Sequence, residues 1–504
     1  MSAGPDSLGV AVAAPHTLAV EAGLEAAAAG GNALDAALAA AAVLVVAYPH
    51  QCGLGGDLTA LVRDPDGSVV AVLSLGAAPA AVDVAALRAA GTRMPRQGAL
   101  TVTVPGVVAG WAELAALGAR LGLGPPLQRA AALAAAGTPV APGLARAIAE
   151  RHDAVAADAG LADLFLESGQ PLEPGAPLLQ PALAASLQRL IADPGDIYAG
   201  EIAAALVAAL RERGSAIAAE DFAAHTAERA EPLCAQAGGN RWWAAPPPSQ
   251  GATLLALLDP AWGDGPLQRA RAAHSARGRL LGDPRSGPVD LAGLLAPAPA
   301  PPVPGPPRGS GDTVAVTAVD AEGRTVALIQ SVFQTFGAGI LDPATGIVLH
   351  NRGAAFSLEP GHPGELGPGR RPPHTLCPLL GESSEGPAAI GCQGGSAQAL
   401  ILAQLAAAAL QPEADLDAVL ATPRWVLGDR ELGFATETVL AEPGAEAALA
   451  PELAAVAAPP LVLGGGREDR CGHVQIARSV PAGLQAAADP RADGSGAVAS
   501  GAPR

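Results

Sequence analysis

The chain has 504 residues, is 50% hydrophobic and carries a formal net charge of −18 at pH 7. This length allows two to four domains with a large buried core. The acidic balance disfavours partners that bind clustered Lys and Arg, so we expect neither nucleic acid nor an anionic membrane as a partner, but a small-molecule substrate. No basic segment precedes an apolar stretch at the N-terminus, which leads us to expect a cytoplasmic protein.

The first 120 residues predict two helices, then two strands, then a helix. Residues 15–50 form the helix pair, and Gly30-Gly31-Asn32 is the turn between its members. The apolar run at 37–50 is too short to cross a membrane and indicates a buried core helix. Residues 53–76 contain a glycine turn and two strands joined by Asp-Pro-Asp-Gly. A further helix opens after Pro105-Gly106.

Residues 127–220 are predicted to be mostly helical, and a strand, a proline turn and a helix follow from Arg241. From Leu294 the chain reads "LLAPAPAPPVPGPPRGSGD". Pro and Gly at this density exclude a helix or a sheet interior, so we expect an exposed, extended linker.

Strands dominate after the linker. "TVAVTAVD" from Thr313 alternates as a strand does, "AEG" turns, and "RTVALIQSV" returns as the second strand of a hairpin. Residues 386–411 predict a strand, a glycine turn and a long helix. Helices first and hairpins later favour an α+β fold with helices layered on sheets.

The junction between linker and hairpin meets the requirements of an N-terminal nucleophile. A Thr hydroxyl needs a nearby base to act as a nucleophile, and an N-terminal Thr carries one in its own amine, whose pKa is roughly 8. Such a residue must start a rigid strand behind a flexible, exposed segment, and Thr313 meets both conditions. Linkers often end at strands, so an ordinary interdomain linker is the alternative.

The other motifs do not indicate a nucleotide, metal or serine-hydrolase site. The segments "GLGGD" and "LGGGREDRCGH" have neither the spacing nor the Lys of a phosphate loop, and no G-x-S-x-G elbow is present. The five scattered cysteines do not form a disulfide pattern, and Cys471 with His473 lacks the second pair of a zinc site. We therefore expect no metal and no organic cofactor.

A series of segments resembles one known family. In chain order they are "GGNALDAALAAAAVLVVAYPHQCGLGGDL", "VPGVVAGW", "PPPSQGA", "GDTVAVTAVDAEG", "FGAGILDPATGIVLHNRG", "RPPHTLCP", "GCQGGSAQ", "GHVQIA" and "ADPR". Together they resemble the γ-glutamyltranspeptidase family of N-terminal-nucleophile hydrolases, over about residues 8–494. The resemblance implies an αββα four-layer sandwich and a precursor that cuts itself into a large subunit, 1–312, and a small catalytic subunit, 313–504. Two such heterodimers could associate further.

The resemblance also implies site residues. Thr313 matches the nucleophile, and the cleaved bond joins Asp312 to Thr313. Ser331 matches the hydroxyl that hydrogen-bonds the nucleophile, where the family often has Thr. Gly394 and Gly395 match the glycine pair whose backbone N–H groups form the oxyanion hole.

Three further residues match the family's substrate pocket, namely Asn351, His374 and Thr375. The groups that hold a glutamate head are missing: "GAAPAAVDV" has no Arg, and Ala354 and Ala355 replace acidic residues. The segment "HNRGAAFSLEPGHPGELGPGRRPPHTLCP" instead resembles the oxamate amidohydrolase-like branch, in which Arg352 would clamp a small carboxylate. The alternative for Arg352 is a structural or surface ion pair.

We therefore expect an autoprocessed amidohydrolase that acts on a small carboxylate-bearing amide of the oxamate type. A γ-glutamyltransferase or glutathione hydrolase is the alternative within the family. The alternative from another class is an uncleaved, non-catalytic binding or scaffold protein, which the lost glutamate clamp would suit.

Overall fold

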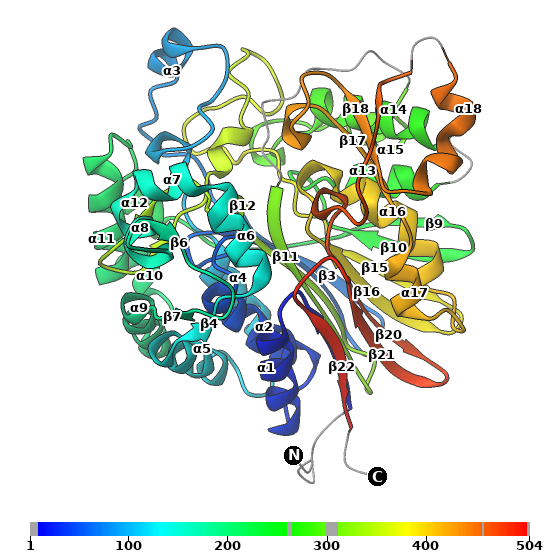
Figure 1. Ribbon diagram of the computed structural model, residues 1–504, viewed down its shortest axis with the longest axis horizontal. Coiled ribbons are helices and arrows are strands. Elements are labelled where there is room, and N and C mark those ends of the chain that lie inside the picture. Colours follow the sequence, from blue (N-terminus) through cyan, green and yellow to red (C-terminus); the bar gives the residue numbers. More distant parts are fainter. Residues whose placement is uncertain (1–8, 260–264, 299–310, 456–457, 501–504) are drawn as a thin grey trace.

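Two antiparallel β-sheets form the centre of the molecule, and helices cover the outer face of each (Figure 1). The computed structural model describes residues 9–259, 265–298, 311–455 and 458–500. The larger sheet has seven strands in the order β22 (Ser495–Ala499), β1 (Val10–Ala14), β11 (Gly311–Asp320), β12 (Thr325–Gln334), β2 (Asp57–Arg63), β3 (Val69–Ser74) and β8 (Glu228–Ala230). The smaller sheet has six strands in the order β21 (Gly483–Ala488), β20 (Val474–Val480), β16 (Gly386–Cys392), β15 (Leu379–Ser383), β10 (Asn240–Ala244) and β9 (Leu233–Ala237).

One group of helices lies on the larger sheet and another on the smaller sheet (Figure 1). The first group comprises α1 (Thr17–Ala28), α2 (Ala33–Ala47), α4 (Val107–Ala116), α5 (Gly124–Ala136) and, outside them, α6 (Pro142–Glu150), α7 (His152–Ala157), α8 (Ala159–Phe165), α9 (Pro181–Ala192), α10 (Asp196–Ala199), α11 (Glu201–Glu212) and α12 (Ala219–Ala223). The second comprises α13 (Gly251–Leu258), α14 (Pro266–Leu280), α15 (Leu291–Leu295), α16 (Gln398–Ala409) and α17 (Leu416–Ala421). The predicted α+β class and αββα sandwich are thus confirmed.

The described chain also contains smaller α-helices and strands. They are α3 (Val84–Ala90), α18 (Ala450–Leu453), a sheet of β17 (Trp425–Gly428), β18 (Thr438–Ala441) and β19 (Leu461–Leu463), and the two-stranded pairs β4 (Thr138–Pro139) with β7 (Pro177–Leu178), β5 (Leu166–Glu167) with β6 (Gln170–Pro171), and β13 (Leu341–Asp342) with β14 (Ile347–Val348). The pairs β4–β7 and β5–β6 interrupt the region 127–220, where helices were predicted and strands of two residues leave no periodic signal.

Helix α2 shows why the N-terminal helix pair forms. Asn32 Oδ1 accepts the backbone N–H groups of Leu34 and Asp35, while the Asp35 carboxylate accepts the N–H of Asn32. This reciprocal cap satisfies donors that the helix cannot pair internally. All fifteen residues of α2 are buried, which confirms the predicted core helix. Within the described ranges, no helix is both long and apolar enough to span a bilayer.

Alternation along β11 and β12 decides which side chains face the second sheet. Val314 and Val316 belong to the core beneath the helices, whereas Ala315 packs between the sheets. The sheets approach closely here, because a Cβ on Gly391 of β16 would lie 2.9 Å from the Ala315 methyl. The same alternation places Thr313 at the end of the space between the two sheets.

The linker prediction is corrected at both of its ends. Residues 291–295 form helix α15, and β11 begins at Gly311 rather than at Thr313. The central part of the predicted linker, 299–310, lies outside the described residues. In the uncut chain the Asp312–Thr313 bond therefore lies inside a strand, two residues after its start.

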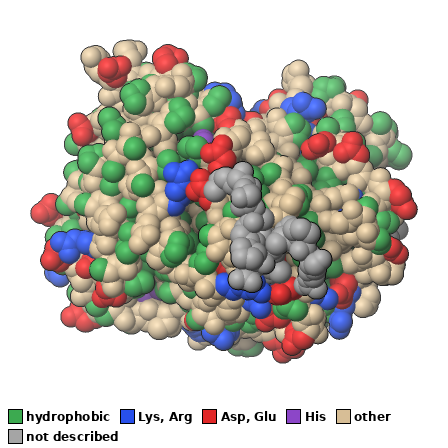
Figure 2. All heavy atoms as spheres, turned by 90° about the horizontal axis from the view of Figure 1, so that it is seen from below, with side chains coloured by type: hydrophobic (Ala, Val, Ile, Leu, Met, Phe, Trp, Pro, Cys, Tyr) green, Lys and Arg blue, Asp and Glu red, His purple; other side chains and the backbone are tan. Residues whose placement is uncertain are grey.

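The molecular surface seen from below mixes charges of both signs (Figure 2). On the described part of this face, acidic and basic side chains lie interspersed among apolar ones, without a continuous basic strip. Such a face does not have the clustered Lys and Arg typical of a nucleic-acid interface.

Candidate active site

Three hydrogen bonds meet at Ser331, beside the Asp312–Thr313 bond. Thr313 Oγ1 donates to Ser331 Oγ at 3.1 Å, and Ser331 Oγ donates to the Asp312 carbonyl oxygen at 2.7 Å. The Phe333 N–H donates to the same Ser331 oxygen at 2.7 Å. Ser331 therefore accepts two hydrogen bonds and donates its only hydroxyl proton to the carbonyl oxygen of Asp312, the group that Thr313 would attack.

The backbone around this bond is irregular. The pairing of β11 with β12 shifts register between Asp312 and Val314, which leaves Thr313 at a bulge. On the facing strand, Phe333 has φ of 79°. A bulky residue rarely adopts the left-handed region, and such strain is typical of functional sites.

The Asp312 side chain is held in a buried position by neutral donors. Thr335 Oγ1 donates to its Oδ2, and Gln393 Nε2 donates to its Oδ1 at 3.4 Å. Burial raises the pKa of Asp312 to about 6, although these two hydrogen bonds and His473 lower it in part. The hydrogen bonds therefore offset only part of the free-energy cost of burying this carboxylate away from water.

The glycine pair forms a tight turn between β16 and α16. Gly394 has φ of 149° and Gly395 has φ of 54°, and a Cβ on Gly394 would lie 2.6 Å from Ile401 Cδ1. Gln393 N–H donates to the His473 carbonyl at 3.1 Å, which fixes the approach to the turn. Within the described part of the chain, the N–H groups of Gly394 and Gly395 have no backbone acceptor.

Asp57 is the centre of a second cluster, which consists of fully buried ionisable side chains. Its Oδ2 lies 3.0 Å from His350 Nδ1, 3.4 Å from Arg352 Nε and 3.2 Å from His374 Nε2. Burial alone would raise the pKa of Asp57, but the two histidines hold it well below its usual range. Asp57 begins β2 and pairs in register with Ser331, so this charge cluster lies one strand away from the hydroxyl pair.

Burial also shifts the basic members of this cluster. It lowers the pKa of Arg352 to about 10 against the opposing effect of Asp57, and lowers that of His374 to about 3, where the charge of Arg352 adds to the effect. His374 is therefore a neutral imidazole at pH 7. The main positive charge beside Asp57 is the Arg352 guanidinium.

The predicted pocket residues do meet in the structure, but most of their polar groups have protein partners. Arg352 Nη1 donates to Thr375 Oγ1 at 3.1 Å, and its guanidinium lies 4.2 Å from the centre of the Phe333 ring. Asn351 Oδ1 accepts the Gln334 N–H, while its Nδ2 donates to the Arg96 carbonyl at 2.7 Å. Among the described residues, Arg352 Nη2 has no hydrogen-bond partner.

A cavity of about 900 Å³ opens beside Asp312. Asp312, Thr335 and Gln393 form part of its wall, as do Tyr48, His50 and His473. Charges of both signs stand around it, with Arg146 and Arg467 among the cations. Thr313 itself is buried behind Asp312, and Arg352 and its neighbours do not belong to this wall in the described structure.

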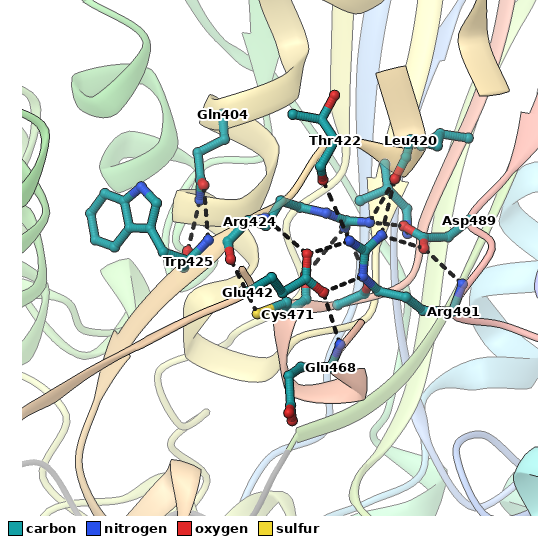
Figure 3. Close-up of polar contacts among 12 residues, drawn as sticks. Gln404, Leu420, Thr422, Arg424, Trp425, Glu442, Glu468, Cys471, Asp489 and Arg491 are labelled. Carbon is teal, nitrogen blue, oxygen red and sulfur yellow. Dashed lines mark hydrogen bonds and ion pairs between the residues drawn. The ribbon is translucent and has the colours of Figure 1, made fainter. Parts of the chain in front are cut away.

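A buried network of ion pairs holds one side of the cavity in place (Figure 3). Its charged members are Arg424, Glu442, Asp489 and Arg491. Arg424 Nη1 donates to the carbonyls of residues 471 and 472, each at 3.2 Å, immediately before His473. Because the His473 carbonyl holds Gln393, the network fixes the position of the segment that leads into the glycine pair.

The structure brings together residues that the sequence did not single out. Asp57 lies in the "GLGGD" segment, which we interpreted as a glycine turn and rejected as a phosphate loop, and His350 precedes the predicted Asn351. Thr335 and Gln393 both contact the predicted residue Asp312, but no sequence motif indicated either of them. A buried acid at the start of a strand, as Asp57 is, could have been suspected from its position after three glycines.

Comparisons with known proteins agree with this architecture. The family model described as gamma-glutamyltranspeptidase matches residues 19–262 and 267–499. The oxamate amidohydrolase proenzyme of Klebsiella pneumoniae is 34% identical, over 97% of this chain and 98% of that protein. The glutathione hydrolase-like YwrD proenzyme of Bacillus subtilis is 32% identical, over 83% of this chain and 85% of that protein. The crystal structure of cephalosporin acylase from Bacillus halodurans superposes with a TM-score of 0.85 at 28% identity, covering 100% of this chain and 98% of that one.

Proposed function

The chain belongs to the gamma-glutamyltranspeptidase family of amidohydrolases, and on this premise we propose that it is a precursor that cuts itself before Thr313 and then hydrolyses a small carboxylate-bearing amide. The observation that carries the proposal is the hydrogen-bond chain from Thr313 through Ser331 to the Asp312 carbonyl. This chain supports the proposal because it links the hydroxyl that would attack to the carbonyl that would be attacked through one shared hydroxyl. Both named relatives are described as proenzymes, which supports processing.

In the first reaction, Thr313 Oγ attacks the carbonyl carbon of Asp312. Ser331 stabilises the charge that develops on the carbonyl oxygen, and the peptide C–N bond breaks as the nitrogen of Thr313 gains the proton that the Thr313 hydroxyl gives up. Water then hydrolyses the ester between Asp312 and Thr313. The products are chains 1–312 and 313–504, the second with a free amine on its nucleophile.

In the second reaction, the freed amine takes the proton of the Thr313 hydroxyl as its oxygen attacks the substrate amide. The N–H groups of Gly394 and Gly395 would hold the oxyanion, an interaction worth roughly 3–4 kcal/mol. The proton passes to the leaving nitrogen, the C–N bond breaks, and water releases the acyl group as a carboxylate. Removal of Asp312 would open the way from the cavity to Thr313.

A carboxylate-bearing amide such as oxamate is the substrate class we favour, because the chain lacks the Arg and the acids that would hold a glutamate head. Arg352, His374 and Thr375 as carboxylate donors, and Asn351 as a pocket residue, remain predictions. The ion pair with Asp57 competes for the same guanidinium. A cytoplasmic location and a dimer of heterodimers also remain predictions.

The test compares ammonia release from oxamate and succinamate with glutamate release from γ-glutamyl-p-nitroanilide, using the same protein. We expect faster turnover of a carboxylate-bearing amide. Faster turnover of the γ-glutamyl compound would instead favour a glutathione hydrolase or transferase, for which the family resemblance is the support. Thr313→Ala is the control, and it should yield one uncut chain without either activity. A wild-type protein that stays uncut and inactive would favour the scaffold alternative.

A further inference from the structure

The uncut chain holds a carboxylate in a defined place beside the nucleophile. Asp312 Oδ2 accepts a hydrogen bond from Thr335, and Asp312 Oδ1 accepts one from Gln393 Nε2 at 3.4 Å. Both donors belong to the wall of the cavity, and Asp312 is 7% exposed. Neither donor carries a charge, so the pair selects by geometry and hydrogen bonding.

Asp312 is also the acyl partner of Thr313 in the self-cutting reaction. Its carbonyl carbon is joined through Cα and Cβ to the side-chain carboxyl, so two carbon atoms separate the attacked carbonyl from the carboxylate. A later amide substrate must bring its own carbonyl carbon to the same oxygen, because a nucleophile reacts only across a near-contact distance. Once Asp312 has left, the hydrogen bonds that Thr335 and Gln393 make to it could form instead to a ligand of the same shape.

We propose that Thr335 and Gln393 form the carboxylate subsite of the mature enzyme and select monoamides of dicarboxylic acids with two carbons between amide and carboxylate, that is, succinamate and its derivatives. This inference rests on the proposed function, because it requires cleavage before Thr313. It differs from the Arg352 assignment in both place and chain length. The carboxylate of oxamate is bonded directly to its amide carbonyl and would stop two carbon–carbon bonds short of these donors.

The surroundings agree with an anionic ligand of modest size. Arg146, Arg467, Arg470 and Arg491 line the same cavity, although Glu150, Glu468 and Asp469 offset part of their charge. The balance of hydrolysis is simple: Thr313 Oγ displaces ammonia from the amide, and water then frees the acid from the ester. Arg352, in contrast, is fully buried with Asp57 and lies outside the wall of this cavity.

The first experiment measures ammonia release by the cut wild-type protein from oxamate, malonamate, succinamate, glutaramate and butyramide. Butyramide keeps the length of succinamate but has a methyl group where the carboxylate would be. We expect kcat/KM for succinamate to exceed that for oxamate and for butyramide at least tenfold. Equal or better hydrolysis of oxamate or butyramide would overturn the subsite.

Variants locate the donors. Thr335→Val should raise KM for succinamate about tenfold and lower the succinamate-to-butyramide ratio of kcat/KM, while Thr335→Ser, which keeps the hydroxyl, should restore both. Thr226→Val is the matched control, since Thr226 is exposed and does not line this cavity. An unchanged ratio in Thr335→Val would contradict the assignment. If this variant is not cut, the wild-type series and the binding measurement decide.

Binding separates this inference from the proposed function. Calorimetry on the cut wild-type protein should show succinate binding at least tenfold more tightly than butyrate, whether or not any amide is turned over. If the protein is cut but hydrolyses no amide, the proposed function fails, and this binding difference alone decides the subsite. Equal binding of the two acids would overturn it. An uncut wild-type chain on a denaturing gel would overturn both, because Asp312 would then keep the site.

Discussion

The Ser331 hydroxyl has one proton to donate, and the structure shows which group accepts that hydrogen bond. It points to the Asp312 carbonyl, while the Thr313 hydroxyl and the Phe333 N–H both point to the Ser331 oxygen. In this arrangement the Ser331 hydroxyl polarises the Asp312 carbonyl and at the same time accepts the hydrogen bond of the Thr313 hydroxyl. This geometry supports the proposal that Ser331 activates the carbonyl in the self-cutting reaction.

The buried carboxyl of Asp312 should make the free energy of unfolding of the uncut chain depend on pH. Burial raises its pKa from 3.8 to about 6 in the uncut chain, so the native state binds this proton more tightly than the unfolded state does. The contribution of Asp312 to the free energy of unfolding should therefore fall as the pH rises from about 4 to about 6, by roughly 3 kcal/mol in total, and stay constant above that.

Urea unfolding of Thr313→Ala and of Thr313→Ala/Asp312→Asn between pH 4 and 7 measures this effect. The first variant keeps the chain uncut, and the second also removes the titrating group. Buried histidines titrate in both variants, so the difference between the two stability curves isolates Asp312. A difference that does not change across this pH range would show that the carboxyl is not desolvated.

At the scale of elements, the residues of the site lie near the starts and ends of strands. Asp57 begins β2, Ser331 lies near the end of β12, and Thr313 lies near the start of β11, all at one end of the space between the sheets. The fully buried Arg352 follows β14 and balances Asp57 across this end. Removing one partner of a buried ion pair leaves the other charge without compensation.

Asp57→Asn should therefore destabilise the protein by about 3–5 kcal/mol. The change preserves shape and an acceptor for the Gly76 N–H, which Asp57 Oδ1 accepts at 2.9 Å. Urea unfolding in the uncut Thr313→Ala background is the measurement. Adding Arg352→Met should recover part of the loss, because it removes the uncompensated charge. A loss below about 1 kcal/mol for Asp57→Asn would contradict the importance of the pair.

Local patterns predicted the hairpin of β11 and β12, the α1–α2 pair and the strand-turn-helix around Gly394, because in each case the signal lies within a short window of sequence. They did not predict the cluster around Asp57, whose members are separated by about 300 residues and meet only through sheet pairing. Gly311 and Asp312 were assigned to the linker because Gly is a weak strand former. Their pairing with Gln334 and Phe333 shows that tertiary contacts override this preference.

At the scale of the whole molecule, both sheets are shared between the two predicted subunits. In the larger sheet β1 pairs with β11 and β12 pairs with β2, and in the smaller sheet β10 pairs with β15. Cleavage before Thr313 would break one backbone bond but none of these ladders. The cut protein should therefore remain a single folded unit.

Gel filtration tests this expectation. In non-denaturing buffer the two chains should elute together, at the 49.4 kDa of the intact chain or at a multiple of it, and should separate only in denaturant. Thr313→Ala, which cannot be cut, provides the reference volume. Separate elution of the chains without denaturant would contradict the shared sheets.

The most direct test of the central claim is N-terminal sequencing of a purified preparation that hydrolyses a carboxylate-bearing amide. The account predicts two chains, and the second should begin at Thr313. An active preparation that contains only the full-length chain would show that the Asp312–Thr313 bond need not break, and would contradict Thr313 as an N-terminal nucleophile.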